Sequence, residues 1–439
     1  MSRAGERLDE NRSALLALGF GTAVAMWWLG YLARLPRAQF VPAWLLAAGM
    51  LALMVAGGCV AGRWGGRGWS LGARAGLLTA VLNLLILGSL LGGEHPNQIV
   101  PAAVVWVPGS LVLGAVLGGA GAAFGARGAP ARPEVDWRGA FGAVAAVATL
   151  LLVVVGGLVT SKQAGLAVVD WPNSFGYNMF LYPLSRMSGG VYYEHAHRLF
   201  GSLVGLTTLV LAVHLHRVEE RRWVRRLSLV LLAVVIVQGI LGGLRVTGGF
   251  TWSTSPEDMA PSTALAVVHG VLGQLFFGSM VALAVFVSRG WRRAVWVRET
   301  AGAQTDRVFA GALVFALVVQ LVLGAVQRHT DQGLMIHITM AALVVGLGLS
   351  AGVRAWGLYG DVPVLSRLGT WLLSVLGVQV LLGIGALIAV TARAAGSPDR
   401  PWQVAVTTAH QTTGALLLAT TVLLLVWLVR LVRPAPVEA

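Results

Sequence analysis

The chain has 439 residues, of which 56% are hydrophobic and only 11% are charged. Soluble domains usually carry about 25% charged residues, so the composition excludes an ordinary soluble protein and indicates a polytopic helical membrane protein. The net charge of +14 comes largely from arginines in short loops between apolar stretches, a pattern typical of membrane topology signals and not of nucleic-acid binding. The single cysteine, Cys59, excludes an intrachain disulfide, a thiolate zinc site and an iron–sulfur cluster.

The chain begins with a polar, charged segment, residues 1–12, which we interpret as a retained cytoplasmic tail because it has no small-residue cleavage site. Long apolar stretches follow it. About 20 apolar residues cross a bilayer, and by this rule the sequence predicts twelve membrane spans. In chain order they are 14–33, 42–62, 75–93, 100–125, 139–160, 194–215, 227–247, 263–288, 308–327, 334–353, 368–391 and 403–429.

Arginine-rich loops orient these spans. The loops 216–226 and 289–307 each carry five arginines and have the same parity, whereas the alternate loops are poor in positive charge. Because positive loops stay on the cytoplasmic side, we expect a multi-pass protein of the cell (inner) membrane with both termini in the cytoplasm.

A polar linker, residues 126–138, divides the chain. We expect an all-α polytopic fold in which two pseudo-symmetric four-helix bundles, an eight-helix domain, follow about four extra transmembrane helices. The expected units are 1–138, an N-terminal membrane unit of unknown role, 139–300, the first half, and 301–439, the second half. Because the repeat described next lies wholly after residue 138, a chain that starts near Val135 is expected to insert by itself and to keep the ligand-binding function of that repeat.

Four histidines in the apolar stretches repeat with one internal period. His197 precedes His337 by 140 residues, and His269 precedes His410 by 141. Other residues follow the same period of 141, namely Gln238 with Gln379 and Gly242 with Gly383.

In the predicted topology all four histidines lie roughly 6–12 Å below the outer surface, at about 1.5 Å per helical residue. Ionisable side chains in a bilayer are costly and usually functional. Two neutral imidazoles that face each other across a bundle are natural axial ligands of haem iron, so we predict two haem sites near the outer face. A bound metal ion is the weaker alternative, because no carboxylate or thiol joins the second-half pair. For a single histidine, interhelical hydrogen bonding is the other reading.

The two halves differ around the first histidine pair. Glu194 lies one helical turn before His197, and Arg198 follows it, whereas their repeat positions are Leu334 and Ile338. The first half also has a long outer segment, 161–193, where the second half has only 328–333. A carboxylate one turn from a haem ligand can accept protons or stabilise positive charge that develops at the macrocycle edge. The asymmetry therefore suggests that the first half does the chemistry and that the second holds a permanent electron-transfer haem. The alternative for Glu194 is a helix-end carboxylate that complements the helix dipole.

Several positive side chains lie on the outer face against the charge rule: Lys162, Arg186, Arg198, Arg245, Arg328 and Arg393. A haem at this depth would direct its propionates outward, and arginine pairs with carboxylates in a bidentate manner. Our candidates for the propionates or the pocket are Arg198, Arg245 and Arg328, together with Asp170 and Trp171 of the first outer segment. Interfacial snorkelling is the alternative.

Together these residues resemble the heme A synthase family of cytochrome oxidase assembly enzymes over about residues 139–430. The matching pieces are GLAVVDWP at 165–172, EHAHRLFGSLVGL at 194–206, QGILGG at 238–243, VVHGVLGQ at 267–274, MIHITMA at 335–341, QVLLG at 379–383 and TTAHQTTG at 407–414. The resemblance implies two four-helix bundles related by pseudo-twofold symmetry. It implies oxidation of the C8 methyl of haem O to the formyl of haem A by successive hydroxylation. It further implies that His337 and His410 hold haem b, that His197 and His269 hold the substrate haem, and that Glu194 is essential.

The chain departs from this family in two places. Some members carry a cysteine pair in the first outer loop, and this chain has none at 161–193. The first 138 residues resemble no part of the family. By the resemblance we expect haem O synthase and cytochrome oxidase assembly factors as protein partners. We expect the chain to lie in a lipid bilayer and to bind no nucleic acid. The electron acceptor is left open, and a homo-oligomer is possible. The alternative functions are a bis-histidine dihaem cytochrome b that carries electrons, or a haem transporter or chaperone.

Overall fold

The computed structural model describes residues 3–36, 41–65, 68–93, 95–127, 134–249, 255–393 and 400–435. The predicted linker 126–138 lies partly outside them, at 128–133. The helices are α1 (Arg3–Ala33), α2 (Ala43–Trp64), α3 (Trp69–Leu91), α4 (Ala103–Gly125), α5 (Trp137–Ser161), α6 (Gly189–Val218), α7 (Arg222–Thr247), α8 (Thr263–Val287), α9 (Arg289–Arg293), α10 (Ala303–Thr330), α11 (Leu334–Leu358), α12 (Pro363–Thr391) and α13 (Pro401–Leu431), with short 3₁₀ turns η1 (Leu184–Arg186) and η2 (Pro256–Asp258) and strands β1 (Arg298–Thr300) and β2 (Val432–Pro434).

In the described part of the chain, twelve helices are long and apolar enough to cross a membrane; α9 is the exception. The prediction of an all-α chain with twelve candidate spans is therefore confirmed. The short helix α9 and the small parallel pair of β1 and β2 were not predicted, because segments of three to five residues carry little periodicity.

Several helices extend beyond the predicted spans. Helix α1 begins at Arg3, so most of the segment expected to be a polar tail is helical. Helix α6 begins at Gly189 and α12 at Pro363, each five residues before the predicted start. The hydropathy rule measures the apolar thickness of a bilayer, whereas the backbone hydrogen bonds of a helix can continue past that thickness.

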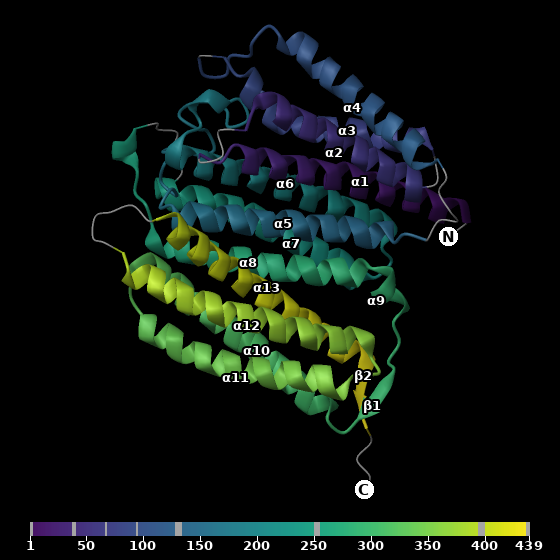
Figure 1. Ribbon diagram of the computed structural model, residues 1–439, viewed down its shortest axis with the longest axis vertical. Coiled ribbons are helices and arrows are strands. Elements are labelled where there is room, and N and C mark those ends of the chain that lie inside the picture. The colour runs from purple at the N-terminus through teal and green to yellow at the C-terminus, as the bar shows by residue number, and fades with distance from the viewer. Residues whose placement is uncertain are drawn as a thin grey trace.

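The long helices lie side by side, so the molecule is elongated across their axes (Figure 1). From one end of the molecule to the other, Figure 1 shows α2–α4, then α1 with α5 and α6, then α7 and α8, then α13 and α12, and finally α10 and α11. Helices α5 to α8 contact one another in sequence and α8 returns to α5; α10 to α13 do the same, and α13 also contacts α5 and α8.

Helix α1 packs directly on the first half. The rings of Tyr31 and Tyr192 stack with their centres 5.6 Å apart, and the Tyr192 hydroxyl donates to the Tyr31 carbonyl at 2.6 Å. Trp27 meets Phe200 edge to face, with ring centres 5.7 Å apart. One continuous cluster of buried side chains joins α1 to α5, α6 and α8. The boundary near residue 138 is thus a boundary in sequence composition, while the apolar packing continues across it.

Polar contacts join the two halves at one end of the helices. The hydroxyl of Ser161 on α5 lies 3.0 Å from that of Thr407 on α13, and the Thr408 hydroxyl donates to Ser161 at 3.0 Å. The Arg328 guanidinium, at the end of α10, donates to the Thr160 carbonyl at 2.6 Å. These bonds tie together the helix ends that adjoin the histidines.

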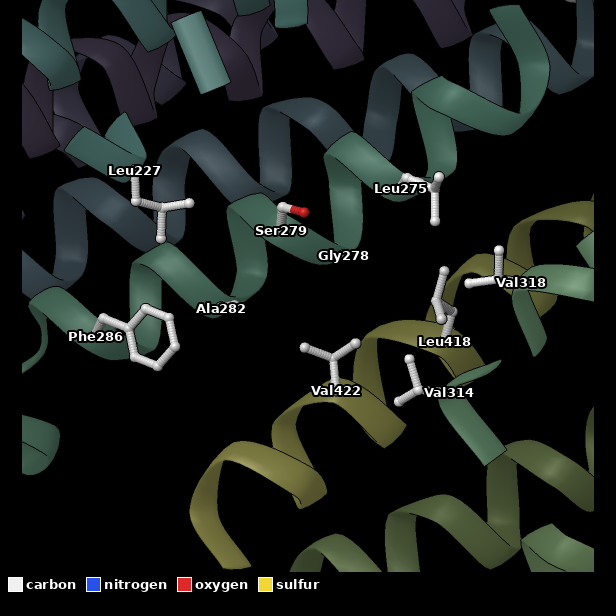
Figure 2. Close-up of a pocket in the computed structure, with 10 residues that line it drawn as sticks. All are labelled: Leu227, Leu275, Gly278, Ser279, Ala282, Phe286, Val314, Val318, Leu418 and Val422. Carbon is white, nitrogen blue, oxygen red and sulfur yellow. The ribbon is translucent and has the colours of Figure 1, made fainter. Parts of the chain in front are cut away.

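An apolar crevice of about 290 Å³ lies elsewhere on the junction between the halves. Figure 2 shows its side chains converging from α7, α8, α10 and α13. Gly278, in its wall, follows His269 by about two and a half turns, so the crevice lies on the side of α8 turned away from that histidine. It is therefore separate from the histidine site.

A buried carboxylate organises the end of α6. The Glu219 side chain is only 3% exposed, and its two oxygens accept hydrogen bonds from the Arg221 guanidinium at 2.8 and 2.9 Å. The Arg138 guanidinium lies 3.5 Å away. Burial by itself would raise the pKa of Glu219, but the hydrogen bonds and positive charges of the two arginines outweigh it and hold the pKa below its usual value.

Candidate functional site

The structure brings the four repeated histidines together as two pairs. The imidazole centres of His197 on α6 and His269 on α8 are 6.2 Å apart, with ring planes at 84°. Those of His337 on α11 and His410 on α13 are 6.5 Å apart, at 81°. The predicted pairing within each half is thus the pairing that the fold produces.

These separations suit an iron atom between each pair. A histidine nitrogen binds a metal at about 2.0–2.1 Å, and the nitrogen lies about 1 Å from its ring centre, so two axial imidazoles place their centres about 6 Å apart. The Nδ1 atoms of all four rings are buried and have no hydrogen-bond partner of normal geometry. Nδ1 of each ring lies on the side of the neighbouring glycine, and Nε2 of His337 lies 3.4 Å from Gln320 Nε2, so Nε2 is the nitrogen left for a metal. The donor set therefore fits bis-histidine haem ligation.

A free metal ion fits the same residues poorly. Among the described residues, no three histidine, cysteine or carboxylate side chains converge in a way that could hold a metal ion. Structural zinc usually needs four such ligands and catalytic zinc three. The two-ligand geometry thus favours a planar macrocycle that supplies the remaining donors itself.

A glycine on the preceding helix lies against each imidazole. A Cβ at Gly156 or Gly324 would approach Cε1 of His197 or His337 to 2.9 Å, and a Cβ at Gly242 or Gly383 would approach Cε1 of His269 or His410 to 3.2 Å. Real Cβ atoms essentially never come within 3.0 Å of a neighbour, and an approach of 3.2 Å is tighter than nine in ten real Cβ contacts. Each glycine therefore makes the room in which its histidine ring is held.

Glu194 and Arg198 join the first histidine pair to the long outer segment. Glu194 is buried; its Oε1 accepts from Arg198 Nη2 at 2.9 Å, and its Oε2 accepts from the Val168 amide at 2.9 Å. Arg198 Nη1 also donates to the carbonyls of Asp170 and Asn173, at 2.6 and 2.9 Å. The carboxylate is thus one turn from His197, as predicted, and the arginine is fully engaged with the protein.

Asp170 and Trp171 shape the segment that lies over this site. The Asp170 side chain is 2% exposed and accepts the amides of Phe175 and Gly176 at 2.6 and 2.8 Å. The Trp171 ring packs against Gly243 of α7, where a Cβ would come within 2.3 Å of it. The two residues therefore order the segment and dock it on the bundle.

Arg245 and Arg328 lie at the same end of the helices. The Arg245 guanidinium, on α7, packs against Gly165, where a Cβ would lie 2.4 Å from Nη2. It is within electrostatic range of Glu194, His197 and His269. Arg328 binds the Thr160 carbonyl, as described above. Of the three predicted propionate candidates, Arg198 and Arg328 hydrogen-bond to backbone carbonyls, whereas Arg245 lies within electrostatic range of both histidines of the first pair.

Sequence reasoning missed one buried residue beside the site. His195 is completely buried; its Nδ1 lies 3.0 Å from the Ser174 hydroxyl, and its ring lies 5.0 Å from that of Tyr182. Burial raises the pKa of the Tyr182 hydroxyl, which keeps this contact neutral. His195 pins the outer segment to α6, and only its place beside Glu194 could have indicated this role.

Comparison with known proteins gives one family match. Residues 140–339 match the COX15-CtaA family, described as cytochrome oxidase assembly protein. The match covers α5 to α10 and the start of α11, and it includes three of the four paired histidines. No curated protein matches the chain.

Proposed function

Because residues 140–339 belong to the COX15-CtaA cytochrome oxidase assembly protein family, we propose that this chain is a heme A synthase. In this reaction the C8 methyl of haem O, the substrate, is oxidised to the formyl of haem A by successive hydroxylation. The observation that carries the proposal is the presence of two histidine pairs at nearly equal ring separations, 6.2 and 6.5 Å. One pair binds a resident cofactor and the other binds the substrate, in two related four-helix bundles.

His337 and His410 are assigned to haem b, since their half has no carboxylate or long segment beside the pair. Haem b supplies electron transfer when it is bound. His197 and His269 are assigned to the substrate haem, because Glu194 and the outer segment adjoin only this pair. The assigned roles are thus distributed by the asymmetry of the surroundings and not by the ligands.

In the first half each protein group has a separate task. His197 and His269 hold and orient the substrate within the bundle. The Glu194 carboxylate accepts a proton one turn away, and its bonds to Arg198 and Val168 keep it in place. The segment around Asp170 and Trp171 excludes water from above the site. Arg245 provides the cationic group for a substrate propionate.

In the membrane, the arginine-rich loops support an arrangement with both termini in the cytoplasm and the histidine layer near the outer face. The partners proposed with this function are haem O synthase, which would supply the substrate, and assembly factors of cytochrome oxidase, which would receive the product.

Pigment analysis tests the proposal. The chain is expressed in a host that makes haem O but not haem A, and the haems are extracted and separated. The synthase should yield haem A or its alcohol intermediate, and His337→Ala or His410→Ala should remove the stable low-spin b-type spectrum. The similar geometry of the two pairs also favours a dihaem cytochrome b that carries electrons; extraction of haem b alone would support that function and refute the synthase.

A further inference from the structure

A glutamine on the preceding helix lies beside three of the four histidine ligands, and two of these glutamines hydrogen-bond to the backbone of the histidine. In α7, α10 and α12 the glutamine lies four residues, and therefore one turn, before the glycine that contacts the imidazole. These pairs are Gln238 with Gly242, Gln320 with Gly324, and Gln379 with Gly383.

The glutamine amides reach the backbone of the ligand helices. Gln238 Nε2 donates to the His269 carbonyl, and Gln320 Nε2 donates to the His337 carbonyl, both at 3.0 Å. Gln379 Nε2 lies beside Gly414, one turn after His410, where a Cβ would be 3.3 Å from it. The Gln238 and Gln320 amides therefore tie ligand-bearing turns to the neighbouring helix by hydrogen bonds, and the Gln379 amide packs against such a turn.

The imidazoles themselves lie near the main chain of the same three glutamines, although the geometry at Nδ1 is too loose for a hydrogen bond. A ligand whose backbone is held by a neighbouring helix is better preorganised for its metal.

His197 lacks this brace. Its glycine, Gly156, is present on α5, but the residue one turn earlier is Leu152, which has no amide to donate. A Cβ at Gly201, one turn after His197, would meet no atom within 4 Å. At the equivalent Gly273, which follows His269 by one turn, a Cβ would lie 3.0 Å from Gln238 Nε2. The turn that carries His197 therefore has no glutamine brace from the preceding helix and has free space beside Gly201, although Glu194 and Arg198 of the same turn are held by the outer segment.

We propose that His197 is the exchangeable ligand of the site, and that Leu152 and Gly201 are the positioning residues that make it so. This inference rests on the proposed function, in which the first-half haem is a substrate that must enter and leave while haem b stays. Release would require only that His197 Nε2 leave the haem with its electron pair, so no further reactant would be involved. The two halves thus use the same arrangement of paired histidines for different ends. One half retains its haem, and the other binds and releases a haem in each turnover.

Haem transfer tests the inference. The full chain, purified and loaded with haem b in both halves, is mixed with excess apomyoglobin, and the transfer is followed by absorbance. The wild type should lose its first-half haem faster than its second-half haem. Leu152→Gln introduces the missing amide and should slow the first-half phase by about two- to tenfold, the effect of one net hydrogen bond. Leu152→Met, a control of similar length without a donor, should leave that phase unchanged.

The repeat offers the reverse experiment. Gln320 is the α10 counterpart of Leu152, so Gln320→Leu should speed the loss of the second-half haem by a similar factor. Equal transfer rates for Leu152→Gln and Leu152→Met would overturn the inference, as would an unchanged second-half phase in Gln320→Leu. If Leu152→Gln fails to insert, the Gln320→Leu result decides. The assay measures haem ligation and not oxidation. If the chain shows these transfer rates but never makes haem A, the proposed synthase function is refuted while the inference about His197 stands.

Discussion

Replacing Glu194 by glutamine is expected to stop the oxidation while leaving both histidine pairs able to bind haem. The four proposed histidine ligands lie on α6, α8, α11 and α13 and do not change. The substitution removes the negative charge one turn from His197, but it keeps an oxygen that can accept from Val168 or Arg198.

The structure sets the size of the structural cost. Glu194 and Arg198 side chains are 6% and 10% exposed, so their hydrogen bond is shielded from water, and bonds to charged groups contribute about 1.5–3 kcal/mol. Arg198 keeps its carbonyl acceptors at Val168, Asp170 and Asn173, so it is not left unpaired. We therefore expect the free energy of unfolding to fall by about 1–3 kcal/mol, while the oxidation rate falls by about 10²–10⁴, the usual contribution of a general acid or base.

Two measurements separate these effects. Haem content and thermal unfolding of the purified protein report the structural cost, and separated haem products report the oxidation. Asp170→Asn is the matched control, because it weakens the outer segment at the amides of Phe175 and Gly176 without changing Glu194. Glu194→Gln should accumulate haem O or a hydroxylated intermediate, and Asp170→Asn should not. Near-normal haem A formation by Glu194→Gln would refute the role of this carboxylate, and equal losses in the two variants would reduce it to an anchor of the segment.

Three further predictions follow from the packing. Gly324→Ala places a methyl 2.9 Å from the His337 ring and should weaken the b-type spectrum, whereas Gly311→Ala, on the same helix with no atom within 4 Å, should leave it intact. A chain that starts at Val135 lacks α1, which packs against the first half. This chain should lose haem from the first half and keep haem in the second, as measured by haem per chain. Full haem occupancy of both halves would contradict this packing argument. The depressed pKa of Glu219 means that its carboxylate stabilises the fold above the ordinary glutamate pKa of about 4.3, and this contribution is lost as the pH falls from there through the lower folded pKa. Near neutral pH, the Glu219→Gln variant should therefore unfold at a lower temperature than the wild type. The difference between the two unfolding temperatures should shrink below about pH 4.

The histidine pairs could be predicted because ionisable side chains in an apolar stretch stand out, and because one period relates the four of them. Gly156 on α5 and Gly324 on α10 could not be predicted from the period, for a physical reason. The long outer segment lies between α5 and α6, so Gly156 and Gly324 are 168 residues apart and do not follow the period of the other helices. The glutamine brace was visible only once helix neighbours were known.

Other contacts have no sequence signature at all. Arg198 looked free to bind a propionate, but backbone carbonyls of the outer segment fold over it, and any residue can supply a carbonyl. The docking of α1 was hidden because a helix that faces lipid and one that faces another helix are equally apolar.

The β1–β2 pair has a consequence for how the chain matures. Strand β1 precedes α10 and β2 follows α13, and backbone bonds join them from Val297 to Leu431 and from Ala435 to Thr300. The segments that begin and end the second half are thus joined to each other by the β1–β2 pair. Since domains fold from the N-terminus during synthesis, α1 to α8 can assemble in the membrane while the ribosome is still making the second half. The β1–β2 pair can form only after residue 434 has emerged from the ribosome. The first half is therefore complete before the ends of the second half can be joined.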